Sequence, residues 1–165
     1  MKIHDILFIG AGASALMAAS HLEGHDVALV DANPKIGAKL LISGGGKCNL
    51  TNRFATEQNY LGDEAFIKPV LQAFDASSTL SFVKKHRLNL EERAHGQMFC
   101  ANSAKELISI FGRLTSFCTF YLSTKVNRIE KKDHFVIYTD KSEIHAKKVV
   151  VASGGLSYAS IGASD

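Results

Sequence analysis

The sequence predicts an α/β domain whose parallel sheet begins with a βαβ unit, and three observations support this fold class. The apolar runs at residues 3–9 and 26–31 are typical of buried strands. Between them lie a glycine-rich turn and a helix of small residues, which we expect to end near Gly24. Residues 149–152 form a third apolar run, and we expect this strand to return to the same sheet.

The composition is that of an ordinary globular protein. Hydrophobic residues make up 46% and charged residues 21% of the 165 residues, which is enough for a core and argues against disorder. The net charge of +3, with a pI near 8.7, is too weak to indicate nucleic-acid binding by itself. No apolar run has the length of a membrane span, and the first residues do not resemble a signal peptide. We therefore expect no membrane association.

The cysteines and histidines show no spacing typical of a metal or redox centre. Cys48, Cys100 and Cys118 are far apart in the sequence, and no CxxC pair is present. Reduced thiols in a cytoplasmic protein are the simplest interpretation. We interpret Cys48 as a packing or backbone-contact residue rather than a redox centre. The seven histidines lack ligand spacing, so no metal site is predicted.

The middle of the chain predicts helices and the last third predicts strands. Helical periodicity covers residues 64–74, 77–87 and 103–117, with Ser103 and Glu106 as a capping box at the start of the third helix. Residues between the second and third helices look extended or irregular. Five short strands then follow, which we expect to form a small β-meander and a returning strand. These strands are predicted at 119–123, 125–132, 134–140, 143–147 and 148–153.

We predict a single domain over residues 1–165. Within it, the predicted segments are the βαβ unit at 1–33, a loop at 34–55, a helical segment at 60–117, and the β-meander with the returning strand at 119–155.

The turn after the first strand has the pattern Gly10-x-Gly12-x-x-Ala15. Gly10 permits a tight turn, Gly12 lets the backbone approach a pyrophosphate, and Ala15 allows close packing of helix on strand. Asp31 ends the next strand, where an acid accepts hydrogen bonds from ribose hydroxyls. The unit therefore predicts dinucleotide binding, but it does not separate NAD from FAD.

The following segment, KIGAKLLISGGGKCNLTN at residues 35–52, favours FAD. An NAD dehydrogenase would have its next α/β unit here. Instead there is a run of three glycines, which is unsuited to the interior of a helix or strand, among small polar donors. Bare amides can reach phosphates or a flavin ring, and Lys39 or Lys47 can supply positive charge. An NAD(P)-binding dehydrogenase domain remains the alternative.

Together these motifs resemble the BaiN/RdsA-like FAD-dependent flavoprotein family, often described as NAD(P)/FAD-dependent or aminoacetone-oxidase-like oxidoreductases. Its hallmark, G-x-K-x-x-x-S-G-G-G-[RK]-C-N-x-T-N, is matched throughout by the glycine-rich segment. GAGASA near the start, VVVASGGLSYASIGASD at residues 149–165 and the segment at 96–99, similar to G-R-x-F-P, also match. The resemblance covers essentially the whole chain.

The resemblance implies an FAD-binding Rossmann-like domain of glutathione-reductase type, with FAD as cofactor and NAD(P)H as a candidate electron donor. It also implies a set of cofactor-binding residues. These are Gly10, Gly12, Ala13 and Ser14 for the pyrophosphate; Asp31 for the ribose; Lys39, Ser43, Gly44, Gly46, Cys48 and Asn49 for the phosphate and flavin side; Val126 for the adenine; and Ser153, Gly154 and Gly155 for closure over the cofactor.

Three positions depart from the family pattern: Asp31 replaces Glu, Cys100 replaces Pro, and Ser153 replaces Thr. Family members are more than twice as long as this chain, with an inserted substrate domain and a final FAD-contacting segment. We therefore expect a truncated protein, the N-terminal cofactor-binding part of an oxidoreductase, with a catalytically silent protein as a further alternative. The family's range includes reduction of carbon–carbon double bonds in steroids or in a uracil of ribosomal RNA, and amine oxidation. The sequence does not choose the substrate and indicates no general acid or base.

Overall fold

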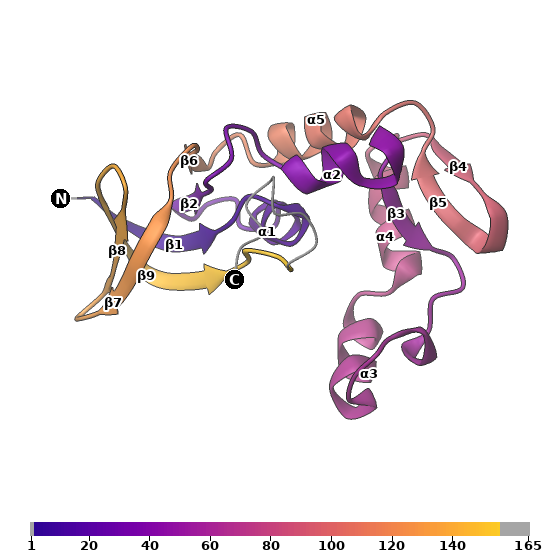
Figure 1. Cartoon of the computed structure of the whole chain (residues 1–165), viewed down its shortest axis with the longest axis horizontal. Coiled ribbons are helices and arrows are strands. Elements are labelled where there is room, and N and C mark those ends of the chain that lie inside the picture. The colour runs from indigo at the N-terminus through magenta and orange to yellow at the C-terminus, as the bar shows by residue number, and fades with distance from the viewer. Residues whose placement is uncertain (1, 156–165) are drawn as a thin grey trace. The chain divides into compact units, whose positions relative to one another are not determined.

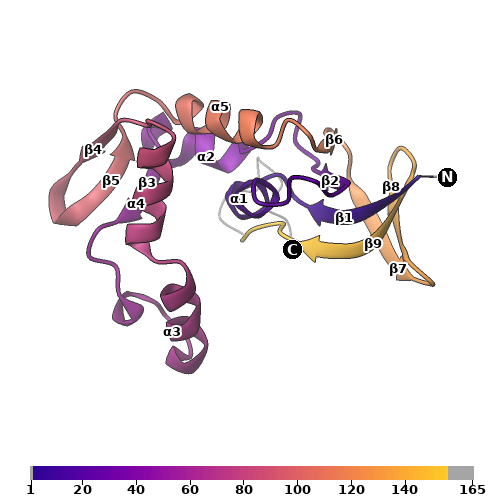
Figure 2. The same ribbon diagram turned by 180° about the vertical axis from the view of Figure 1, so that it is seen from behind.

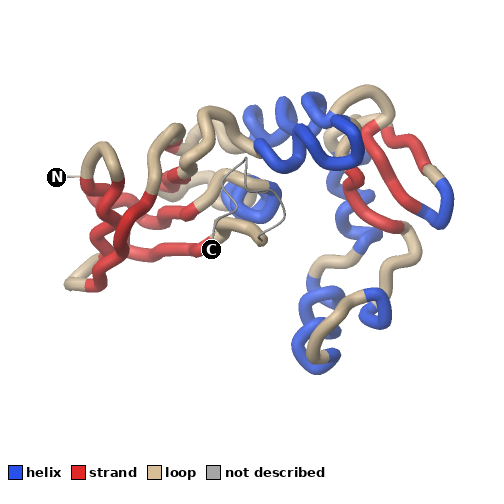
Figure 3. The backbone as a smooth tube through the Cα atoms, in the orientation of Figure 1, coloured by secondary structure: helices blue, strands red, loops and turns tan. Residues whose placement is uncertain are grey.

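The computed structural model of the protein describes residues 2–155 (Figure 1). The chain divides into two compact units. The first unit comprises Met1–Leu40 and Ile108–Asp165, and the second comprises Leu41–Leu107. Figure 3 shows that strands make up much of the first unit, whereas helices and a small group of strands make up the second.

The first unit is built on a six-stranded sheet with the order β6-β2-β1-β9-β8-β7. The four strands β6, β2, β1 and β9 run parallel, while β8 and β7 continue the sheet as antiparallel strands (Figures 1 and 2). Their bounds are β1 Ile3–Ile9, β2 Val27–Val30, β6 Thr119–Tyr121, β7 Val126–Lys131, β8 Phe135–Thr139 and β9 Glu143–Val151. The predicted α/β fold class is therefore confirmed.

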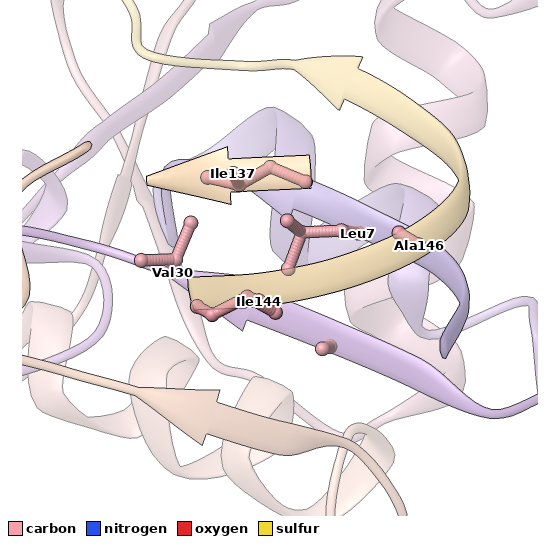
Figure 4. Close-up of a cluster of buried hydrophobic side chains, with 6 residues drawn as sticks. Leu7, Val30, Ile137, Ile144 and Ala146 are labelled. Carbon is pink, nitrogen blue, oxygen red and sulfur yellow. The ribbon is translucent and has the colours of Figure 1, made fainter. Parts of the chain in front are cut away.

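A compact cluster of aliphatic side chains stabilises this sheet. Leu7 from β1, Val30 from β2, Ile137 from β8, and Ile144 and Ala146 from β9 are almost completely buried together (Figure 4). Burying each of the larger side chains contributes roughly 1.5–3 kcal/mol. The cluster therefore joins the parallel and antiparallel parts of the sheet into one core.

The βαβ unit forms as predicted, but its helix is shorter than expected. Helix α1 spans Ala13–Ala19 and buries Ala15 and Leu16, whose small or aliphatic side chains permit close packing. The Ser20 hydroxyl donates to the Met17 carbonyl at 2.7 Å, and the chain then turns well before Gly24. A serine hydroxyl that competes for backbone carbonyls is typical of such a helix end.

Two expectations about the strands were wrong. Residues 143–147 and 148–153 are not separate strands, because β9 runs continuously from Glu143 to Val151 and pairs with both β8 and β1. Lys147 and Lys148 do not interrupt the strand. The ammonium group of Lys147 donates to the carboxylate of Asp5 on β1 at 2.7 Å. Strand β6 does not belong to the meander either. It pairs with the edge of β2 and extends the parallel sheet.

The second unit contains a three-stranded antiparallel sheet with the order β3-β5-β4. The sequence left these strands as irregular segments, because runs of three or four residues carry too little periodicity. Their bounds are β3 Asn49–Asn52, β4 Leu90–Glu92 and β5 Gln97–Cys100, with short 3₁₀ turns at Glu57–Asn59 and Ala94–Gly96.

The predicted helices of the second unit are present. Helix α3 spans Glu64–Ala73 and α4 spans Ala76–Lys85. Each begins at an aspartate whose carboxylate accepts a backbone N–H of the first turn: Asp63 from Ala65, and Asp75 from Ser78. Helix α2, at Ala38–Ile42, and helix α5, at Ala104–Leu114, each contain a boundary between the two units.

The capping box predicted at the start of α5 is not formed. The Ser103 hydroxyl accepts the N–H of Lys105 at 3.2 Å, and the Glu106 carboxylate accepts the side-chain amide of Asn102 at 2.8 Å. The helix also ends earlier than expected, because the Thr115 hydroxyl donates to the Phe111 carbonyl at 2.7 Å just beyond its last turn. Within residues 2–155, no helix has the length and apolar character needed to cross a membrane.

The core cluster predicts a clear stability effect. Leu7→Ala should lower the free energy of unfolding by about 2–5 kcal/mol, because Leu7 is fully buried and its truncation leaves a cavity. Ile129→Ala on β7 is the control, since Ile129 is 42% exposed. Urea denaturation measures both variants. Equal destabilisation by the two substitutions would contradict the proposed position of the core.

Candidate cofactor site

The candidate site of the first unit lies at the carboxyl ends of β1, β2 and β9. Gly10 directly follows β1, Asp31 directly follows β2, and Ser153 lies two residues after the end of β9. Three residues that the sequence singled out therefore come after three adjacent strands. Ligands of parallel α/β sheets bind at this edge, where neighbouring connections diverge.

Gly10 lies where the turns after β1 and β9 approach each other closely. Its N–H donates to the Val30 carbonyl at 2.7 Å, and the Ala152 N–H donates to Ile9 at 2.8 Å. Its φ of +110° is disfavoured for any other residue, and a Cβ here would overlap the carbonyl group of Ala152. Gly10 is therefore required by the protein's own packing.

Gly12 has a different environment. It precedes α1 with an ordinary φ of −85°, and no side chain caps this helix. A Cβ built on Gly12 would meet no atom of residues 2–155 within 4 Å, and the neighbouring Ala13 and Ser14 are exposed. The protein leaves space beside this backbone, which is what close approach of a ligand requires.

The carboxylate of Asp31 is held by the protein itself. One oxygen accepts the N–H of Ala11 at 2.7 Å, and the other accepts the backbone and side-chain N–H groups of Asn33 at 2.8 and 2.9 Å. Two carboxylate oxygens offer about four acceptor positions, so one remains for a ligand hydroxyl. Asp31 thereby links the glycine turn to the end of β2, a role that the sequence did not suggest.

Gly10 and Asp31 line a pocket of about 420 Å³. It brings together Gly10, Asp31, Val126 and Ser153, four of the predicted cofactor residues. The full lining is Ile9, Gly10, Val30, Asp31, Ala32, Asn33, Thr124, Lys125, Val126 and Ser153.

The turn before β7, at Ser123 and Thr124, was not among the site residues predicted from the sequence. The Thr124 N–H donates to the Asp31 carbonyl at 2.9 Å, and the Ser123 N–H donates to Asn33 at 3.0 Å, so this turn forms one wall of the pocket. The position of this turn depends on the pairing of β6 with β2. The sequence prediction placed residues 119–123 in the meander, and so it did not bring the turn close to Asp31. The sequence carried one sign of the role of Asn33. It lies two residues after Asp31, and an aspartate side chain often accepts a hydrogen bond from the backbone two residues further on.

Lys39 lies beside the turn after β9. Its ammonium group donates to the carbonyl of Gly155 at 2.7 Å, and Gly154 has a φ of +81° that suits glycine. The structure thus brings together three further predicted residues. The rest of the predicted motif, residues 156–165, lies outside the described residues.

The remaining predicted residues, Ser43, Gly44, Gly46, Cys48 and Asn49, belong to the second unit. All three glycines of the run have positive φ, as a glycine run permits. A Cβ on Gly44 would approach the Phe99 ring to 2.6 Å, so this glycine is required for packing within the unit.

The positive charge of Lys47 is already paired. Its ammonium group lies 3.0 Å from the Glu91 carboxylate, whose other oxygen contacts Arg93 at 3.0 Å. These ion pairs lower the pKa of Glu91, with the Lys47 hydrogen bond as the main cause.

The second unit has its own small pocket of about 350 Å³ with neutral, hydrogen-bonding walls. Asn49 and Gln97 both contribute to it. The full lining is Asn49, Leu50, Thr51, Asn52, Ala55, Asn59, Tyr60 and Gln97.

Cys48 has a neighbour that its position in the sequence did not suggest. Its thiol is buried and receives hydrogen bonds from the thiol of Cys100 and the hydroxyl of Ser43. These donors lower the pKa of Cys48 to about 7, although burial acts in the opposite direction. The same contact, together with burial, raises the pKa of Cys100. The sequence spacing gave no sign of this neighbour, because it is the pairing of β3 with β5 that brings the two cysteines together.

Comparison with known proteins identifies the family of this domain. The family described as HI0933-like protein Rossmann domain matches residues 4–165. The chain belongs to this family. An Escherichia coli (strain K12) protein named ribosomal RNA dihydrouridine synthase is 34% identical, over 99% of this chain and 42% of its own length. A Clostridium scindens 3-dehydro-bile acid delta(4,6)-reductase is 30% identical, over 97% of this chain and 41% of its own length. The HI0933-like chain thus spans about two fifths of these relatives.

Solved structures agree with the fold. A flavocytochrome c3 fumarate reductase superposes with a TM-score of 0.60 at 21% identity, over 94% of this chain and 34% of its own. The expected family and the Rossmann-like FAD-binding fold are therefore confirmed. FAD is the cofactor that the HI0933-like family and this fold indicate.

The contact at Gly10 predicts a specific sensitivity. Gly10→Ala should destabilise the protein by about 2 kcal/mol or more, because alanine combines an unfavourable φ with overlap of the Ala152 carbonyl. Gly112→Ala in α5 is the matched control, since a Cβ there meets no described atom outside its own helix within 4 Å and alanine favours the helix. Thermal unfolding compares the two. A Gly10→Ala protein as stable as wild type would disprove the close contact.

Proposed function

We propose that this chain is the FAD-binding part of a flavin-dependent oxidoreductase. One observation carries the proposal: a pocket at the carboxyl ends of the parallel strands is lined by Gly10 and by Asp31, whose carboxylate is a fixed acceptor. The turn that leaves β1 at Gly10 continues to Gly12, where a Cβ would meet none of the described atoms within 4 Å. This combination suits a dinucleotide, whose pyrophosphate needs bare backbone and whose ribose needs an acceptor.

The residues of the first unit divide the work of binding. Backbone at Gly12, Ala13 and Ser14 would contact the pyrophosphate, and the remaining acceptor position of Asp31 would take a ribose hydroxyl. The backbone at Val126 would lie against the adenine. Lys39, placed at Gly155, would add positive charge near the phosphates.

The glycine-rich segment of the second unit supports binding on the flavin side. We propose that Ser43, Gly44, Gly46, Cys48 and Asn49 shape that part of the site, with Gly44 acting through the local backbone rather than by contact. Bound FAD would supply the hydride-transfer chemistry, while the protein orients the ring and sets its surroundings.

For the substrate, we propose a carbon–carbon double bond, with NAD(P)H as the electron donor. Support comes from the relatives' names, ribosomal RNA dihydrouridine synthase and 3-dehydro-bile acid delta(4,6)-reductase. A uracil of ribosomal RNA is the first candidate, since the relatives with that name have identities of 33% and 34%. We propose that this chain binds the cofactor, and that turnover needs the additional length that those relatives have.

A nicotinamide-binding dehydrogenase domain is the second candidate, because the βαβ unit alone suits both cofactors. Purified protein, reconstituted with FAD and freed of excess ligand, should retain an absorbance band near about 450 nm that is typical of oxidised flavin. Protein that remains colourless but gains stability from NAD(P)H would favour the dehydrogenase.

Gly12→Ala is the sharpest test of the site. Because its Cβ would contact none of the described atoms, we expect unchanged stability without ligand but at least about tenfold weaker FAD binding. FAD at 100 times its dissociation constant should stabilise the wild-type protein by about 2.7 kcal/mol, measured as a rise in Tm.

Gly112→Ala is again the control, as an equivalent substitution within helix α5. It should keep the full FAD-dependent rise in Tm. Absence of any rise in the wild-type protein at saturating FAD would reject FAD binding by this chain. An equal rise in wild type and Gly12→Ala would place the pyrophosphate elsewhere.

A further inference from the structure

The second unit contains two buried cysteine thiols in direct contact. Cys48 immediately precedes β3 and is 1% exposed, while Cys100 ends β5 and is fully buried. Nothing in their sequence spacing indicates a pair, because more than fifty residues separate them. Cys118, the third cysteine, belongs to the first unit.

The backbone places the two cysteines on neighbouring strands. Asn49 and Phe99 are partners in the antiparallel ladder, so Cys48 and Cys100 flank the same paired position. The Cys100 N–H donates to the Lys47 carbonyl at 2.8 Å, which holds the backbones together at this point. A disulfide requires Cα atoms about 4.4–6.8 Å apart, and neighbouring antiparallel segments bring residues into that range.

The contact also prepares one sulfur for reaction. The thiol of Cys100 and the hydroxyl of Ser43 both donate to the Cys48 sulfur, and the pKa of Cys48 falls to about 7. The hydrogen bond from Cys100 therefore favours the thiolate of Cys48, which is the nucleophilic form of a cysteine. Cys100 keeps its proton, because its hydrogen bond to Cys48 and its burial raise its pKa.

We propose that Cys48 and Cys100 are an oxidisable dithiol, which hydrogen peroxide converts into an intramolecular disulfide. This inference concerns the second unit alone and does not rest on the proposed function.

The reaction proceeds in two balanced steps. The Cys48 thiolate attacks one peroxide oxygen, the O–O bond breaks, and the departing hydroxide takes up a proton to become water, leaving Cys48 as a sulfenic acid. The Cys100 sulfur then attacks the Cys48 sulfur, the S–O bond breaks, and the hydroxide leaves as a second water with the Cys100 proton. Overall, two thiols are oxidised by two electrons, and one peroxide is reduced to two waters.

The disulfide would act on a strained part of the backbone. Cys48 has a φ of +51° directly after three glycines of positive φ, so the segment depends on its neighbours to keep this conformation. A covalent bond to the end of β5 would join the glycine-rich segment to the small sheet and close a long loop. Constraining the unfolded chain in this way should raise Tm.

The test uses the full chain in its native state. Reduced protein is treated with a slight excess of hydrogen peroxide, remaining thiols are alkylated under denaturing conditions, and peptides are mapped without reductant. We expect a peptide pair linked through Cys48 and Cys100, a loss of two free thiols, and reversal by dithiothreitol. Cys118 should remain a free thiol, since burial raises its pKa to about 11.

Two variants distinguish the pair from general oxidation. Cys118→Ser should form the same linked peptide at the same rate. Cys100→Ser should form none and should leave Cys48 as a sulfenic acid that a dimedone probe captures. The proposal is overturned if all three thiols stay free, if Cys118 is oxidised as fast as Cys48, or if only disulfides between molecules appear.

Discussion

The close approach of the turns after β1 and β9 is the constraint on which the first unit depends. At Gly10 the backbone passes so near the Ala152 carbonyl that no side chain fits, and its N–H is bonded to Val30 on the other neighbouring strand. The ends of three parallel strands thus meet at this residue. Because Asp31 and Ser153 follow two of those strands, the same contact sets the shape of the pocket.

Asp31 adds the second connection at this edge. Its carboxylate binds the amide of Ala11 in the glycine turn and both N–H groups of Asn33. An acid that ends the second strand is usually explained by its ligand alone. Here it is also held by N–H groups of the protein itself, so the pocket is formed in advance and less entropy is lost when a ligand binds.

The glycine-rich segment combines packing with chemistry in the second unit. Gly44 lies against the Phe99 ring, and the same pairing of β3 with β5 brings Cys48 to Cys100. The motif that favoured a flavin therefore has internal structural reasons for several of its residues. Lys47 is an example, since its charge is paired with Glu91 rather than held for a ligand.

The sequence by itself determined the local features whose signals are contained in short stretches. The βαβ unit, the helices near residues 64–74 and 77–87 and the role of Gly10 follow from periodicity and glycine chemistry, and the motif resemblance indicated the family and FAD. Only the tertiary structure decided which strands pair: the place of β6 beside β2, the unbroken β9 and the β3–β5 ladder depend on contacts between distant residues. The turn at Thr124, the fixed carboxylate of Asp31 and the Cys48–Cys100 contact all follow from those pairings. Local patterns report which face of an element is buried but not which partner buries it, and for that physical reason these features could not be read from the sequence.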